Sequence, residues 1–222
     1  MSESFWEQIA TGSGEALRSQ PEESRAVVLV SARTALDPEA SSLLDECVRL
    51  LRPGGVLFVY GQPAQLPSWG EALTRMAAEK WRMVFKSWIA LDIDDAPRDG
   101  FLKPVHRGLL MFLKDDAGRT KPGPAPLNTA EVKVPHRICT ACRKNVKDWG
   151  GKKHLMNPKG VALSDVWRDL PKSRLRDAVA PDCVMERIRA LTKHTAAGGL
   201  HVLQVPPRKA ERRVPVQREN AA

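Results

Sequence analysis

The chain has 222 residues, of which 42% are hydrophobic and 27% charged, as is usual for a globular protein with one good-sized core. No apolar run approaches the roughly 20 residues of a membrane-spanning helix, and the acidic, polar N-terminus does not read as a signal peptide. We therefore expect a cytoplasmic protein. In that compartment its four cysteines, Cys47, Cys139, Cys142 and Cys183, are thiols or metal ligands rather than disulfides.

The positive charge is concentrated in the second half of the chain. Residues 1–100 contain 10 Lys or Arg and 15 Asp or Glu, a net of −5. Residues 101–222 contain 25 and 11, a net of +14, and the two halves give the overall +9. A basic half of this size favours a polyanionic partner, most simply nucleic acid, over a merely solvated surface or a basic tail.

Apolar periodicity predicts strands that alternate with helices. In chain order we expect a short helix over 5–17, a strand over 26–30, a helix over 37–51 stopped by the Arg-Pro-Gly-Gly at 52–55, a strand over 56–60, a helix over 68–80, strands over 81–91 and 106–114, a helix over 181–192 and a strand over 200–205. This alternation predicts an α/β fold with a mostly parallel sheet flanked by helices.

Composition also suggests how the chain is divided. We predict a polar N-terminal extension over 1–24, one domain over 25–205 and a basic disordered tail over 206–222. Within the domain, residues 115–170 interrupt the alternating pattern. They begin with a stretch rich in Pro, Gly, Asp and Lys, and continue as an inserted Cys/Trp/Lys-rich segment that is a candidate for zinc binding or DNA recognition.

Several segments in order carry a resemblance to a known family. They are LLRPGGVLFVYG, KSWIALDID, PVHRGLLMFLK, the stretch from Asp148 to Leu170 (DWGGKKH to SDVWRDL) and PDCVMERIRALT. This order resembles the permuted, β-class-like DNA amino-methyltransferases, which transfer a methyl group from S-adenosylmethionine to adenine N6 or cytosine N4. The resemblance covers roughly residues 25–205 and implies a Rossmann-like methyltransferase sheet, with the catalytic half before the cofactor half.

The chain departs from that family where its first strand ends. The family has a Ser/Asp/Asn-Pro-Pro-Tyr/Phe turn there, which accepts hydrogen bonds from the target amino group and stacks on the flipped base. Here the strand continues into Ser31-Ala32-Arg33-Thr34. Ser31 is the one candidate acceptor, a degenerate catalytic residue without the proline pair or the aromatic ring.

A second departure follows the last predicted strand. The family ends this strand in an acidic residue and a Phe-x-Gly-x-Gly loop, whose glycines let the backbone approach the methyl donor. Here Pro206-Pro207-Arg208-Lys209 follows, and prolines fix φ and remove N–H donors. We therefore predict no cofactor-binding residues, and no binding of S-adenosylmethionine without a partner.

Cys139 and Cys142 form a Cys-x-x-Cys pair that can supply half of a tetrahedral zinc site. His136, His154 and Cys183 are the candidate further ligands. A redox pair is disfavoured because no thioredoxin-like pattern surrounds it, and two ordinary thiols remain an alternative.

A basic turn follows the cysteine pair. Its candidate DNA-binding residues are Arg143, Lys144, Lys147, Gly150, Gly151, Lys152, Lys153 and His154. Backbone amides and lysines of such a turn can contact phosphates, and a solvated loop is the alternative. Trp149 and Trp167 can stack on bases, although tryptophans beside apolar positions more often lie in the core.

These observations favour a catalytically inactive, methyltransferase-like protein. It would act as a DNA-binding or scaffolding subunit beside an active enzyme, in a bacterial restriction-modification or defence system. One alternative is an active S-adenosylmethionine-dependent adenine-N6 or cytosine-N4 methyltransferase subunit completed by a partner chain. Another is a zinc-dependent protein-interaction module, and RNA is an alternative polyanion.

Overall fold

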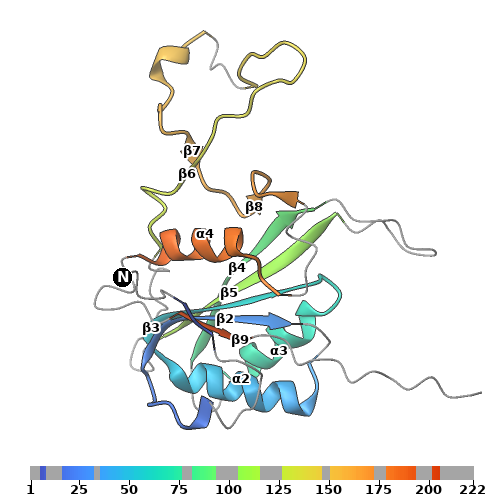
Figure 1. Cartoon of the computed structure of the whole chain (residues 1–222), viewed down its shortest axis with the longest axis vertical. Helices are drawn as coiled ribbons and strands as arrows, with labels where there is room; N and C mark the ends of the chain where they lie inside the picture. Colours follow the sequence, from blue (N-terminus) through green and yellow to red (C-terminus); the bar gives the residue numbers. More distant parts are fainter. Residues whose placement is uncertain are drawn as a thin grey trace, which may run out of the picture.

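A computed structural model describes residues 6–8, 17–32, 36–76, 82–93, 105–115, 127–146, 151–172, 179–193 and 202–205. Its centre is a seven-stranded sheet with the order β1-β9-β2-β3-β5-β4-β8 (Figure 1). These strands are β1 (Trp6–Gln8), β2 (Arg25–Ala32), β3 (Leu51–Gly61), β4 (Met83–Asp92), β5 (His106–Lys114), β8 (Val166–Trp167) and β9 (Val202–Val205). The helices are α2 (Pro38–Leu50), α3 (Leu66–Met76) and α4 (Asp182–Thr192).

The sheet is mixed, with a single reversed strand among those described. β5 runs antiparallel to β3 and to β4, whereas the other adjacent pairs are parallel. The α/β class and the mostly parallel sheet predicted from the sequence are confirmed. Every residue of β2 is buried, as expected for a central strand that is covered on both faces.

Two apolar layers lie on opposite faces of the sheet because successive strand side chains point to opposite sides. One layer joins α2 and α3 to the sheet, and its buried residues include Val28, Val30, Leu44, Val48, Leu57, Leu66 and Leu73. The other joins α4, with Val27, Leu29, Phe58, Tyr60, Trp167, Val184 and Ile188. Figure 1 shows α4 on one side of the sheet and α2 and α3 on the other.

Helix α2 is held at both ends by side chains. Asp37 is its N-cap and accepts a 2.7 Å hydrogen bond from the backbone N–H of Ala40, while Pro38 occupies the first turn. At the other end the ammonium of Lys114, whose side chain is only 2% exposed, donates to the carbonyls of Val48 at 3.2 Å and Leu51 at 2.5 Å. A buried cation from β5 thus lies at the C-terminus of α2, where the Val48 carbonyl also accepts from the backbone N–H of Leu51.

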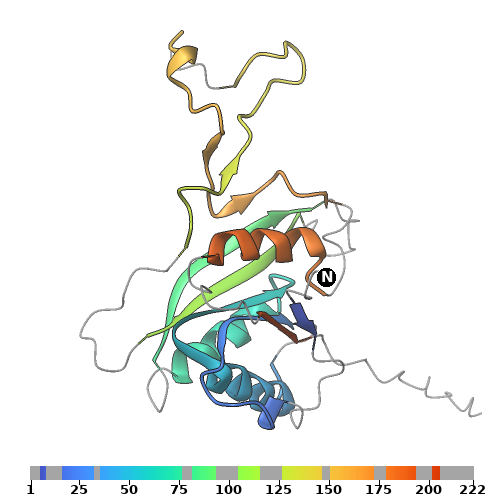
Figure 2. The same ribbon diagram turned by 60° about the vertical axis from the view of Figure 1, so that its left-hand side comes forward.

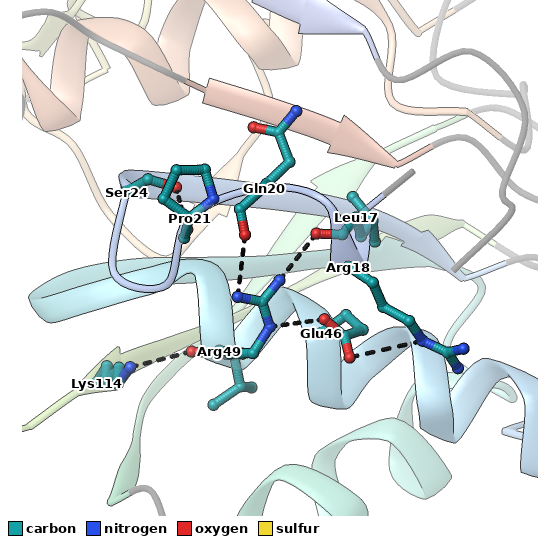
Figure 3. A network of polar contacts seen from close by, with 9 residues as sticks. Leu17, Arg18, Gln20, Pro21, Ser24, Glu46, Arg49 and Lys114 are labelled. Atoms are coloured by element: carbon teal, nitrogen blue, oxygen red, sulfur yellow. Dashed lines mark hydrogen bonds and ion pairs between the residues drawn. The ribbon is translucent and has the colours of Figure 1, made fainter. Parts of the chain in front are cut away.

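Arg49, on the last turn of α2, ties the preceding segment to the helix (Figure 3). Its guanidinium donates to the backbone carbonyls of Gln20 at 3.1 Å and Leu17 at 2.8 Å, and to the Glu46 carboxylate at 2.7 Å. Leu17 is buried in the core on the α2 side. The described residues at 17–24 therefore pack on the domain, and the predicted boundaries at 24/25 and 205/206 stay predictions.

Two details differ from the sequence prediction. The helix expected over 5–17 is wrong at Trp6–Gln8, which forms β1 and pairs in parallel with β9. A sheet edge open to pairing has overridden local helix propensity there. The Arg-Pro-Gly-Gly at 52–55 does not separate helix from strand as a turn, because α2 ends at Leu50 and β3 starts at Leu51. Instead it lies within β3, where the register with β2 shifts.

The described residues of the range 133–162, which are 133–146 and 151–162, form an arm that projects from the body beyond α4 (Figures 1 and 2). Its stem is a separate two-stranded antiparallel sheet of β6 (Lys133–Val134) and β7 (Val161–Ala162), and its tip includes the 3₁₀ turn η1 (Lys153–Leu155). Gly160 has φ +109, and a Cβ there would lie 2.1 Å from the carbonyl oxygen of Val134, so the stem needs glycine.

No helix in the described parts of the chain is long and apolar enough to cross a membrane.

Candidate functional site

Ser31, the candidate amine acceptor, lies near the carboxyl end of β2 and is 3% exposed. Its Oγ accepts a 3.2 Å hydrogen bond from the backbone N–H of Ala180, next to Pro181, the N-cap of α4. The hydroxyl therefore serves to hold the entry of α4 against the sheet. A buried N–H without that acceptor would cost about 1–3 kcal/mol, so the contact has a structural role of its own.

The two family motifs that the sequence lacks fall largely outside the described residues. Ser31 and Ala32 end β2, whereas positions 33–35 and 206–222 are not described. The loss of the methyl-donor loop therefore stays a prediction from the sequence, and so does the predicted basic tail.

The arm gathers much of the positive charge of the chain. Residues 133–162 contain eight Lys or Arg and one Asp, a net charge of +7. Of the predicted DNA-binding residues, Arg143, Lys144, Gly151, Lys152 and His154 are exposed on this arm. Lys153 contributes its backbone to η1, and Lys147 and Gly150 lie outside the described residues, as does Trp149.

Sequence reasoning missed two further exposed cations on the arm, Arg137 and Lys159. Arg137 lies across a hairpin from Val146, whose N–H donates to the Arg137 carbonyl at 2.8 Å. Lys159 directly precedes Gly160 at the stem. The stem strands are two residues each, which is too short for an apolar pattern to reveal, so nothing in the sequence placed these residues on one arm.

The cysteine pair occupies the turn of the hairpin. Cys139 N–H donates to the Lys144 carbonyl at 2.8 Å, and Arg143 N–H donates to the Cys139 carbonyl at 2.9 Å. Arg143 takes φ +58, a conformation that residues other than glycine seldom adopt. Hydrogen bonds from the backbone N–H groups of Cys142 and Ala141, and from the Cys142 side chain, lower the pKa of the Cys139 thiol.

The predicted zinc ligands do not come together beyond this pair. In the described ranges, no three His, Cys, Asp or Glu side chains are grouped so that they could hold a metal ion. His136 Nε2 lies 2.7 Å from the carbonyl oxygen of Asn157, and Cys183 packs against the core on the α4 side. His154 is exposed on η1. A zinc site completed within the chain remains a prediction.

Trp167, which the sequence assigned to the core rather than to base stacking, is 1% exposed. Its indole N–H donates to the Ser164 carbonyl at 3.0 Å, and the Arg187 guanidinium of α4 lies 5.2 Å from the ring centroid. Arg187 also forms two hydrogen bonds to the Asp169 carboxylate, at 2.8 and 2.5 Å, which lower the pKa of that carboxyl. These contacts attach the segment that follows the arm, at Trp167 and Asp169, to α4; we call this segment the base of the arm.

Comparison with known proteins shows a similarity to part of a methyltransferase. No family model matches the chain. The chain is 38% identical over 128 residues to the type II methyltransferase M.BamHI of Bacillus amyloliquefaciens, a match that covers 57% of this chain. The chain is therefore similar to part of a DNA methyltransferase. It spans 27% of the length of M.BamHI, about a quarter of that protein.

Two solved structures align with most of this chain. TTHA0409 of Thermus thermophilus, described as a DNA modification methylase, has a TM-score of 0.49 and 18% identity, over 92% of this chain and 89% of that one. The M1.HpyAVI complex with S-adenosylmethionine has a TM-score of 0.44 and 10% identity, over 88% and 87%. Both TM-scores lie below 0.5, so neither structure adds to the argument.

Proposed function

We propose that this methyltransferase-related chain binds DNA through its arm, as a DNA-binding or scaffolding subunit, and does not transfer methyl groups by itself. The observation that carries the proposal is the net charge of +7 on residues 133–162, with exposed cations on a segment that projects from the body (Figure 2). A cationic surface of this kind binds phosphates and releases condensed counterions. Kinship with DNA methyltransferases makes duplex DNA the first polyanion to test.

The body supports the second half of the proposal. The described residue at the amine-acceptor position, Ser31, is buried and holds the N–H of Ala180. Turning its hydroxyl toward a flipped base would require the entry of α4 to move. The sequence after the last strand, Pro206-Pro207, offers no glycines for a methyl-donor loop.

The test is a fluorescence anisotropy titration of the full chain with a short duplex at several salt concentrations. We expect log affinity to fall linearly with log salt, by about 0.9 per neutralised phosphate. The double variant Arg143→Ala/Lys144→Ala should bind more weakly, and the magnitude of its slope should drop by about 2.

A matched control removes two positive charges from the body. Arg18 and Arg75 have side chains that are 64% and 78% exposed, and each pairs only with a glutamate in the contacts described, Glu46 and Glu71. Arg18→Ala/Arg75→Ala should leave the slope unchanged. If both double variants lose affinity equally, the arm is not the DNA interface. If wild-type affinity does not depend on salt, the proposal fails.

An active subunit completed by a partner chain is the competing function. Ser31 keeps a hydroxyl at the right end of β2, which is the feature in its favour. This alternative requires a partner with a glycine-rich methyl-donor loop and a measurable transfer to adenine N6 or cytosine N4 when both chains are present. Transfer that is lost in Ser31→Ala and recovered in Ser31→Asp would favour it.

A further inference from the structure

The hairpin around Cys139 and Cys142 has the form of half a thiolate metal site. Residues 137–146 are closed by a bridge between Ile138 and Asn145 and by the backbone hydrogen bonds of Cys139. The Cys142 thiol lies within hydrogen-bonding reach of the Cys139 thiol in this turn. Two cysteines at this spacing can both ligate one metal ion from a tight turn.

The other two cysteines cannot complete this half-site. Cys47 is fully buried among the residues that join α2 to the sheet, and burial raises its pKa to about 12. Cys183 lies on α4 and packs against the opposite core. No third potential ligand joins Cys139 and Cys142 in the parts of the chain that the structure describes. A structural zinc ion needs four ligands in a tetrahedron, so two are still required.

The surface around the pair is unusually apolar for an exposed segment. Ile138 is 57% exposed, Val146 is 55% exposed and Leu155 is 66% exposed, all on the arm. Ile138 and Val146 belong to the same hairpin as the cysteines, on either side of them in the sequence. Apolar side chains left in solvent beside polar ones are typical of a contact surface.

We propose that one zinc ion is bound between the Cys139/Cys142 hairpins of two copies of this chain. Two identical pairs related by a two-fold axis supply four sulfurs, and such isologous contacts are the commonest way that chains associate. The four thiols lose their protons to solvent as four Zn–S bonds form, and no redox change takes place. The copies would bury Ile138 and Val146 beside the metal.

Charge makes this association depend on the metal. A tetrathiolate zinc centre carries a net charge of −2, and the exposed Arg137, Arg143 and Lys144 beside it offset that charge. Without zinc, two arms that each carry +7 repel one another. The inference does not rest on DNA binding, because the sulfur ligands and the apolar surface are separate from the phosphate contacts.

The experiment measures zinc content and mass on the full chain, purified without chelator. We expect one zinc ion per two chains and, by light scattering, a species of twice the 24.6 kDa chain mass. A strong chelator should return the monomer, and added zinc should restore the dimer. The Cys139→Ser/Cys142→Ser variant should be a zinc-free monomer, while the Cys183→Ser control should behave as the wild type.

Cobalt substitution gives a second readout that does not depend on any variant folding. A tetrahedral Co²⁺ spectrum with the thiolate charge transfer of four sulfurs is the expected result in the wild-type protein. One metal per monomeric chain would overturn the proposal in favour of ligands within the chain. A zinc-free wild-type protein, or a dimer that survives the chelator, would also overturn it. None of these outcomes would affect the salt-dependence test of DNA binding.

Discussion

The body and the arm of this protein use their polar and apolar side chains in opposite ways. In the body even polar groups are buried and hydrogen-bonded within the fold. Ser31 accepts from the N–H of Ala180, and Lys114 donates to the Leu51 carbonyl just after α2. In the arm the cations Arg143 and Lys144 are exposed, and so are large apolar side chains such as Ile138. Polar groups in the body thus find partners within the fold, whereas the arm exposes its cations and apolar side chains to solvent.

This difference between body and arm indicates that the function of this protein should be sought in the arm. A fold can be maintained by packing alone, and we propose that Ser31 is now part of that packing. Charge and sulfur on a projecting hairpin contribute little to a core, so their presence calls for a partner. Substitutions in the body should change stability, and substitutions in the arm should change binding.

The largest expected effect is on the body. Lys114→Met keeps the length of the side chain but removes the buried ammonium that donates to the carbonyls of Val48 and Leu51 and pairs with Glu23 at 3.5 Å. We expect a loss of about 3 kcal/mol in the free energy of unfolding, measured by urea denaturation. Lys172→Met, at a lysine 49% exposed, is the control and should change stability by less than about 0.5 kcal/mol. Equal effects would mean that the buried lysine does not cap α2.

Gly160→Ala should break the stem of the arm without unfolding the body. The new Cβ would meet the Val134 carbonyl at 2.1 Å in a backbone with φ +109. The strain is on the order of 1–3 kcal/mol and falls on β6 and β7 alone. Hydrogen exchange should speed up in the arm, and DNA affinity should fall, while the urea midpoint of the body stays the same. A shifted midpoint would show that arm and body are one cooperative unit.

Ser31→Ala tests the comparison at the candidate amine acceptor. It removes the acceptor for the Ala180 N–H and should destabilise the protein by about 1–2 kcal/mol. DNA affinity should not change, since the residue is buried in the body. Thermal unfolding and the anisotropy titration check both statements. Unchanged stability together with altered DNA binding would instead assign Ser31 to a working site.

The smallest effect concerns the base of the arm and depends on pH. Hydrogen bonds from Arg187 lower the pKa of Asp169 in the folded protein below its unfolded value of about 3.9. This contact therefore stabilises the fold above pH 4 and is lost as pH falls through the folded pKa. Both side chains are partly exposed, so Asp169→Asn should cost less than about 1 kcal/mol at pH 7.

The matching control for Asp169→Asn is the same measurement at pH 3. There the wild type should have lost part of the contribution, so the gap between variant and wild-type urea midpoints should shrink. A gap of equal size at both pH values would show that the carboxylate charge plays no part.

The sequence predicted the elements whose pattern is local. The apolar run at Val27–Val30, the cap at Asp37 and the strand at His106–Lys114 all lie where periodicity and helix signals placed them. Elements that depend on distant partners could not be predicted. β1 exists through its pairing with β9, and the stem of the arm through two strands of two residues.

The candidate site divides in the same way. Residue type and spacing singled out the Cys139/Cys142 pair and most of the arm's cations, because these signals lie within one short segment. The hydrogen bond that the Ser31 hydroxyl accepts could not be predicted from the sequence, because its donor, Ala180, is 149 residues away. The contact between His136 and the carbonyl of Asn157 likewise depends on how the arm folds back on itself, so the sequence did not predict it.

A calorimetric titration of the full chain with S-adenosylmethionine tests most directly whether the body has kept its chemistry. We predict no detectable heat, with or without duplex DNA, because Pro206-Pro207 follows the last strand where glycines would be needed and Ser31 is committed to packing. Micromolar binding, or methyl transfer by this chain alone, would contradict the account and indicate an active methyltransferase.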